Sequence, residues 1–85
     1  MTESMMYQTQ LVLEVLKERM PRGYGITSME AIEMFGATRL SAIIFNLRKK
    51  LATTDYDIIS EWREGTSRYG KKTRYVEYVM IERVV

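Results

Sequence analysis

The sequence predicts an α+β fold in which three helices precede a two-stranded β-hairpin. Two segments repeat apolar residues every three to four positions, which is typical of amphipathic helices. A glycine separates the second and third predicted helices, and after Leu51 the apolar residues recur at every second position, as in half-buried strands. We expect residues 1–85 to form a single domain, because 85 residues suffice for only one domain of ordinary size.

The first helix is expected over residues 8–20. Its apolar residues form a one-sided stripe, which consists of Leu11, Val12, Val15, Leu16 and Met20. Pro21 should end this helix, because proline disfavours a helical conformation in the residue before it. Residues 25–27 are expected to form a short extended segment that pairs with a later strand. Residues 1–7 are either a frayed end or an extension of the first helix toward a dimer contact.

The second helix is predicted over residues 28–35. Thr27 and Glu30 have the spacing of a capping box, in which each side chain accepts a hydrogen bond from the other residue's backbone amide. Gly36 is expected at a positive φ angle that closes this helix, since glycine adopts the left-handed conformation without steric cost.

The third helix is predicted over residues 38–50, with Thr38 as its cap. Its apolar stripe consists of Leu40, Ile44, Leu47 and Leu51. The turn between the second and third helices is short, so they should cross steeply, as in a helix-turn-helix.

Two antiparallel strands are predicted over residues 57–64 and 72–82, because large residues alternate along both segments. Glycines and small polar residues between them indicate a hairpin loop with a basic, mobile tip. Trp62, Tyr75 and Tyr78 are interpreted as core residues and not as platforms for base stacking. The predicted core consists of Leu16, Ile32, Phe35, Leu40, Ile44, Leu47, Ile58, Trp62 and Tyr78.

The composition excludes several kinds of function. The chain has no cysteine and no histidine, which removes the usual zinc sites, the thiolate and serine–histidine nucleophiles, and imidazole acid–base catalysis. We therefore expect no metal, no cofactor, no small-molecule substrate and no enzymatic activity. The apolar runs are too short for a membrane span, and the first residues do not resemble a signal peptide. The expected location is the cytoplasm of a bacterial cell.

The positive charge is concentrated in two segments, although the formal net charge is only +2. Residues 38–50 contain four basic and no acidic residues, and residues 63–74 contain five basic residues and one acidic residue. The predicted order of helix, short strand, helix, helix, strand and strand is that of a winged helix. In that fold one helix enters the major groove and the hairpin, or wing, lies on the neighbouring backbone. We expect the two segments to share one face and to bind double-stranded DNA.

The chain also resembles a family of small phage and prophage winged helix-turn-helix proteins. The resemblance rests on GITSMEAIEMFGATRLSAIIFNLRKK, YDIISEW and GKKTRYVEYVM, in that order. These contain a Thr-x-x-Glu-Ala helix start, Phe-Gly at the turn, Arg-Leu opening the next helix, Leu-Arg near its end and a strand with Tyr-x-Glu-Tyr. The match covers about residues 8–82 and implies a DNA-binding or regulatory role.

Residues outside the apolar stripe of the third helix, together with the wing, form the predicted DNA-binding site. Arg39 lies where recognition helices meet base edges and can bond guanine, while Asn46 can pair with adenine. Thr38, Ser41 and the basic residues suit phosphate contacts, and the wing suits the backbone or the minor groove. The predicted residues are Thr38, Arg39, Ser41, Ala42, Phe45, Asn46, Lys49, Lys50, Arg68, Lys71, Lys72 and Arg74.

Three residues of the third helix have alternative interpretations. Ile43 and Phe45 lie where a DNA-facing helix usually carries polar groups. They are core residues, contacts to a thymine methyl group, or anchors for a protein partner or a homodimer. Arg48 is expected either to touch phosphates or the last carbonyls of its helix, or to pair with a carboxylate such as Glu30 or Glu33.

Two functions are consistent with this sequence. The first is sequence-specific binding of double-stranded DNA by a phage-type regulator of transcription or an accessory factor of recombination. The second is a winged-helix interaction module that binds and inhibits a host protein or enzyme, since a fold does not fix a function. The paired basic segments favour the first function, and the modest net charge together with Ile43 and Phe45 favours the second.

Overall fold

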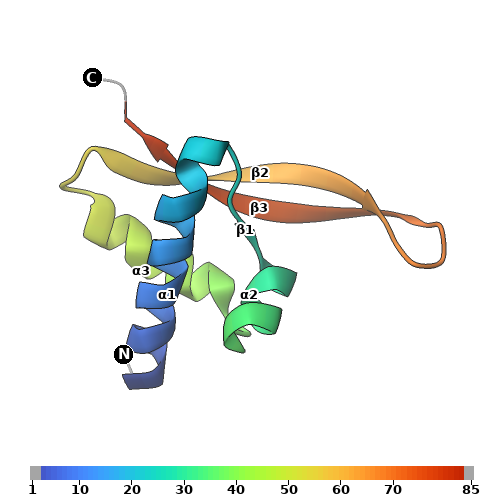
Figure 1. The fold of residues 1–85 in the computed structure, drawn as a ribbon, viewed down its shortest axis with the longest axis horizontal. Helices are drawn as coiled ribbons and strands as arrows, with labels where there is room; N and C mark the ends of the chain where they lie inside the picture. Colours follow the sequence, from blue (N-terminus) through green and yellow to red (C-terminus); the bar gives the residue numbers. More distant parts are fainter. Residues whose placement is uncertain (1–2, 84–85) are drawn as a thin grey trace.

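A computed structural model describes residues 3–83 and confirms the predicted α+β fold. Figure 1 shows the helices gathered on one side of the molecule, with a long hairpin that projects beyond them. The described elements follow the predicted order. They are α1 (Glu3–Arg19), the 3-10 turn η1 (Met20–Arg22), β1 (Ile26–Thr27), α2 (Ser28–Phe35), α3 (Leu40–Leu51), β2 (Tyr56–Thr66) and β3 (Lys72–Glu82).

Helix α1 is longer than the sequence predicted. It begins at Glu3, so that it includes residues 3–7 of the segment that we considered a frayed end or a helical extension. Residues 1 and 2 lie outside the described residues. The helix ends at Arg19, and Pro21 follows in the 3-10 turn. Val12 and Leu16 belong to the predicted apolar stripe, and the side chains of both are fully buried.

The three strands form one antiparallel sheet in the order β1-β3-β2. Ile26 lies opposite Tyr78, which confirms that the segment at residues 25–27 pairs with a later strand. Gly25 precedes β1 at a point where β3 passes very close. A Cβ atom at this position would lie 1.7 Å from the carbonyl oxygen of Tyr78, so the close approach requires a glycine.

Helix α2 and the turn that follows it agree with the prediction. Thr27 and Glu30 form the capping box, and Gly36 has φ 65°. The amide of Gly36 donates to the carbonyl of Ile32 over 2.9 Å, and this bond closes the helix. The prediction that Thr38 caps the next helix is wrong, because α3 begins at Leu40 and its N-cap residue is Arg39, with no side-chain capping bond.

The hydrophobic core is centred on α3. All residues of the predicted stripe of this helix are buried, and Ile43 is buried with them. Helix α1 contributes Val12 and Leu16 to the same cluster, and the base of the hairpin contributes Ile58 and Met80. The interpretation of Ile43 as a core residue is therefore correct.

Three residues that we predicted to be buried are exposed, namely Ile32, Trp62 and Tyr75. Ile32 has 45% of its surface exposed, because α2 turns Ala31 and Phe35 inward and Ile32 lies one helical step away. Trp62 is 65% exposed, since it lies on the part of β2 that extends past the helices. The alternation along β2 correctly placed Trp62 on the same strand face as Ile58, but no helix covers that face so far out. Phe35 and Tyr78 are half-buried against the core.

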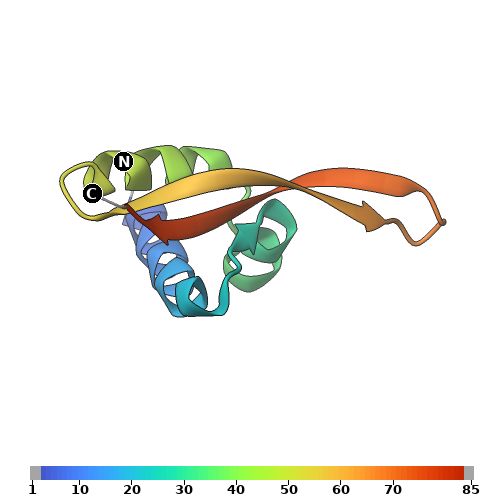
Figure 2. The same ribbon diagram turned by 90° about the horizontal axis from the view of Figure 1, so that it is seen from above.

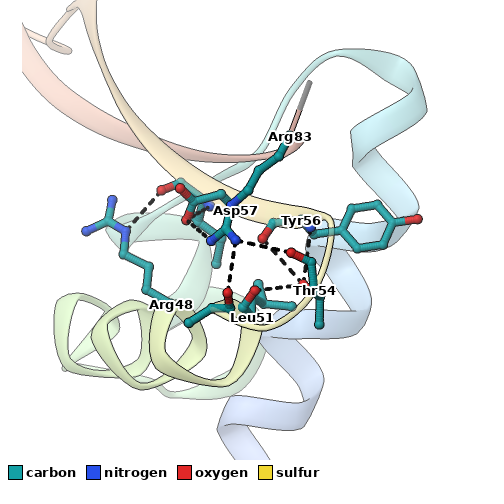
Figure 3. Close-up of polar contacts among 8 residues, drawn as sticks. Arg48, Leu51, Thr54, Tyr56, Asp57 and Arg83 are labelled. Carbon is teal, nitrogen blue, oxygen red and sulfur yellow. Dashed lines mark hydrogen bonds and ion pairs between the residues drawn. The ribbon is translucent and has the colours of Figure 1, made fainter. Parts of the chain in front are cut away.

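A network of polar contacts fixes the end of α3 to the base of the hairpin (Figure 3). The guanidinium of Arg83 donates from Nη1 to the carbonyl oxygens of Ala52 and Thr54, both over 3.1 Å. The Thr54 hydroxyl donates to the carbonyl of Leu51 over 2.8 Å. A cation and a hydroxyl thus satisfy carbonyls at and just after the helix C-terminus, where the helix dipole is negative.

The hairpin projects as an arm because its strands are longer than the helices can cover. β2 and β3 pair over 11 residues each, from Tyr56 opposite Glu82 to Thr66 opposite Lys72. At about 3.3 Å per residue, a strand of 11 residues is roughly 36 Å long, and its outer part lies beyond the helices that pack at its base (Figure 2). The two perpendicular views show the loop of the hairpin well beyond α2 (Figures 1 and 2).

The central place of α3 in the core leads to a stability prediction. Leu47→Ala should lower the free energy of unfolding by about 2–5 kcal/mol, because it removes a fully buried side chain and leaves a cavity. Ile32→Ala, the matched control on the exposed face of α2, should cost less than about 1 kcal/mol. Urea denaturation followed by circular dichroism measures both. A loss below about 1 kcal/mol for Leu47→Ala would place α3 outside the core.

Candidate nucleic-acid interface

Helix α3 presents one row of side chains to solvent, on the side away from its buried stripe. Ser41, Phe45 and Lys49 are spaced four residues apart and are all exposed. Ala42 and Asn46 flank this row and are half-buried. The rotation of the helix is set by its core residues, so this row is held away from the core. Lys50 is also exposed, but it lies on another side of α3, beside Met6, Thr9 and Gln10 of α1.

An aromatic ring stands at the centre of the exposed row. Phe45 has 57% of its surface exposed, which rules out the interpretation of this residue as core. The ammonium nitrogen of Lys49 lies 4.5 Å from the centre of the Phe45 ring, within the range of a cation–π interaction. The row therefore combines an apolar ring with a positive charge directly beside it.

The start of α3 adds a second feature that favours an anion. Thr38 and Arg39 are exposed in the turn before the helix, and the first turn contains no acidic residue. No side-chain oxygen caps the N-terminus of α3, so none compensates the positive end of the helix dipole. The guanidinium of Arg39 lies at this same end.

Arg48 holds α3 against the sheet, so the predictions that it bonds the last carbonyls of its helix or pairs with Glu30 or Glu33 are wrong. Its Nε donates to the carbonyl of Ile58 over 3.0 Å, and its Nη2 donates to the Ser60 hydroxyl over 2.9 Å. Glu30 pairs instead with Arg19, at 2.8 Å. Of the three basic residues in the last turn of α3, Lys49 and Lys50 are exposed and Arg48 is half-buried.

The loop of the wing is a compact turn. The Gly70 amide donates to the carbonyl of Ser67 over 2.9 Å, and the Ser67 amide donates to the carbonyl of Lys71 over 2.7 Å. All four predicted wing residues are exposed, namely Arg68, Lys71, Lys72 and Arg74. Tyr69, between them in the loop, is 85% exposed.

The wing also carries exposed aromatic side chains that we had assigned to the core. The guanidinium carbon of Arg74 lies 5.0 Å from the centre of the Trp62 ring, on the same strand face. Tyr75 is 43% exposed on the opposite face of the hairpin. Both aromatic residues belong to the overhanging part of the hairpin, a property that strand periodicity does not reveal.

Arg63 does not add to the free positive charge of the wing. Its Nε donates to Glu77 over 3.0 Å, and its Nη2 forms ion pairs with both Glu77 and Glu61. The hydrogen bond to Glu77 is the main reason why the pKa of Arg63 is raised. The positive wing surface therefore begins beyond this arginine, toward the loop.

The two basic segments lie along the length of the molecule and not side by side. Helix α3 begins near α2 and ends at the side opposite the wing loop, as both views show (Figures 1 and 2). The start of α3 is consequently nearer to the loop of the hairpin than the end of α3 is. A ligand that touches the whole set must be long, and the largest dimension of the protein is 43 Å.

Comparison with known protein families identifies this arrangement. Residues 7–83 match the winged helix-turn-helix domain over nearly the whole chain. The chain belongs to this family. Comparisons with curated proteins and with solved structures gave no significant match.

The family assignment gives each element of the winged helix-turn-helix its usual part. Helices α2 and α3 form the helix-turn-helix, α3 is the recognition helix, and the β2–β3 hairpin is the wing. Winged helix-turn-helix domains generally bind DNA. Within residues 3–83, none of the helices has both the length and the apolar character needed to cross a membrane.

The structural part that Arg48 plays can be tested against its neighbour Lys50. Arg48→Ala should lower the free energy of unfolding by about 1–3 kcal/mol, because it removes two hydrogen bonds of a charged donor that join α3 to β2. Lys50→Ala, in the same helical turn, should change it by less than about 0.5 kcal/mol. Thermal and urea unfolding measure the difference. Equal effects of the two substitutions would contradict this role.

Proposed function

We propose that the protein is a small phage-type regulator that binds double-stranded DNA in a sequence-specific manner. It acts as a single domain in the cytoplasm of a bacterial cell, either on transcription or as an accessory factor of recombination. The resemblance to phage and prophage winged helix-turn-helix proteins supports this kind of regulator, and membership of the family supports duplex DNA as the ligand.

One observation carries the proposal. The recognition helix with its preceding turn (residues 38–51) and the outer wing (residues 65–76) contain eight basic residues and no acidic one. All eleven acidic residues of the chain lie elsewhere. The exposed Glu64 lies opposite Arg74 on the wing, so the surface is poor in carboxylates and not free of them. Such a surface favours a polyanion, because each buried carboxylate would repel a phosphate.

In this proposal α3 and the wing contact different parts of the duplex. The exposed row of α3 enters the major groove, where Arg39 and Asn46 hydrogen-bond to base edges. Thr38, Ser41, Lys49 and Lys50 contact phosphates on either side of the groove. The wing lies along the neighbouring backbone or minor groove through its four exposed basic residues, Arg68, Lys71, Lys72 and Arg74.

Substitutions in α3 and in the wing should affect DNA binding differently. On a preferred duplex, obtained by selection from a random pool, Arg39→Ala should weaken binding by about 1–3 kcal/mol and barely change non-specific binding. Lys71→Ala and Lys72→Ala should weaken all sequences alike. Each should lower the slope of log K against log salt concentration by about 0.9, the value for one phosphate contact.

Fluorescence anisotropy of labelled duplexes across a salt series measures these effects. Arg22→Ala, which removes an exposed arginine of η1 outside both segments, is the control and should leave the slope unchanged. If neither the Arg39 nor the wing substitutions alter duplex binding, the proposal of a DNA interface is wrong.

A second candidate function is supported by an apolar groove beside the wing. A groove of about 600 Å³ runs between the start of α2 and β3. It is lined in part by Met29, which is 64% exposed, and by Tyr75 and Val76. Such a surface suits a protein partner, in the manner of a winged-helix module that inhibits a host protein, or a second copy of this chain.

The second function makes a distinct prediction. Met29→Asp should abolish co-purification with a host protein, or convert a dimer to a monomer in analytical ultracentrifugation, and should leave duplex binding unchanged. Glu33→Ala, an exposed change on the same helix, is the control. A monomer whose bound proteins are the same with and without Met29→Asp would exclude this function.

A further inference from the structure

The centre of the recognition surface carries a residue that cannot form a side-chain hydrogen bond. Phe45 lies between Ser41 and Lys49 in the exposed row of α3, and 57% of its surface is open to solvent. A recognition helix more often places a polar group there. An apolar ring at this position restricts which base edges α3 can approach.

The major-groove edges of the four bases differ in whether contact with the Phe45 ring is favourable. Where thymine presents its C5-methyl group, a purine presents its N7 acceptor and cytosine presents only a C5 hydrogen. A ring over the N7 acceptor would remove that atom from water without giving it a new partner, which is unfavourable, and a ring over the cytosine C5 hydrogen would bury less apolar surface than one over the methyl group. A ring over the methyl group instead buries apolar surface on both sides.

The neighbours of Phe45 fit the same base pair or the next one. The Lys49 ammonium, 4.5 Å from the ring centre, holds the ring on the helix surface and supplies positive charge toward the duplex. Asn46 is the next residue along α3 and can bond the N6 and N7 atoms of adenine, the partner of thymine. An apolar side chain and a carboxamide side by side therefore match an A·T pair.

We propose that Phe45 determines specificity by reading the 5-methyl group of thymine in the major groove. This inference rests on the proposed DNA-binding function and adds to it the chemical feature of the base that α3 recognises. Removal of that methyl group should weaken binding about fourfold, the change expected for one buried methyl group.

Deoxyuridine tests the inference because it differs from thymidine only by the methyl group and keeps the same base pairing. In the selected duplex each thymidine is replaced in turn by deoxyuridine, and the Kd is measured by anisotropy at one salt concentration. The wild-type protein, Phe45→Ala and Phe45→Leu are compared. Circular dichroism verifies that each variant is folded, which the exposure of Phe45 makes the expected result.

The wild-type protein should lose about fourfold in affinity at one or two adjacent thymidines and nothing elsewhere. At those positions, Phe45→Ala should bind the thymidine duplex and the deoxyuridine duplex with equal affinity. Phe45→Leu should keep part of the preference for the thymidine duplex, because leucine is also apolar. The inference is overturned if no thymidine shows the effect, or if the effect persists unchanged in Phe45→Ala. The absence of any selected duplex would instead overturn the proposed DNA-binding function, and with it this inference.

Discussion

The burial of one side of α3 is the constraint on which the rest of the structure depends. Five side chains of this helix fill the core that α1 and the base of the hairpin complete. A fully buried aliphatic side chain contributes about 1.5–3 kcal/mol, and a domain of this size has few such residues to spare. Rotation of α3 about its axis would expose several of them at once. The row of Ser41, Phe45 and Lys49 is therefore held outward with little freedom.

The polar contacts at the end of α3 fix the position of the hairpin relative to this helix. Arg48 joins the helix to β2, and Arg83 joins the end of β3 to the turn after the helix (Figure 3). The base of the hairpin is therefore attached on both strands. Beyond this base the two strands are stabilised by their own pairing, and side chains such as Trp62 have no helix to pack against. The overhang is what gives the protein a wing.

The basic residues divide into those that build the fold and those that face solvent. The cations in structural contacts are arginines: Arg19, Arg48, Arg63 and Arg83 bond carbonyls or carboxylates. Their planar guanidinium groups can satisfy two acceptors at once. All five lysines of the chain are exposed, and four of them lie on α3 or the wing. The net charge of the sequence therefore says less about partners than the position of these lysines does.

The sequence alone determined those features of the fold that depend on residues close together in the chain. The capping box of Thr27 and Glu30, the positive φ of Gly36 and the order of helices and strands follow from local spacing, because each is a backbone preference over a few positions. The sequence also indicated which residues of α3 and the wing to examine as a DNA interface. That these residues bind DNA stays a prediction.

The tertiary structure decided what depends on distant contacts. Only the fold shows that Trp62 and Ile32 are exposed, that Ile43 is buried, and that Arg48 and Arg63 are bonded within the protein. Periodicity assigns a residue to one face of a helix or strand, but whether that face is covered depends on where another element ends. Where the helices end also decides how far the wing extends beyond them. It likewise decides how far apart the two basic segments lie along the molecule.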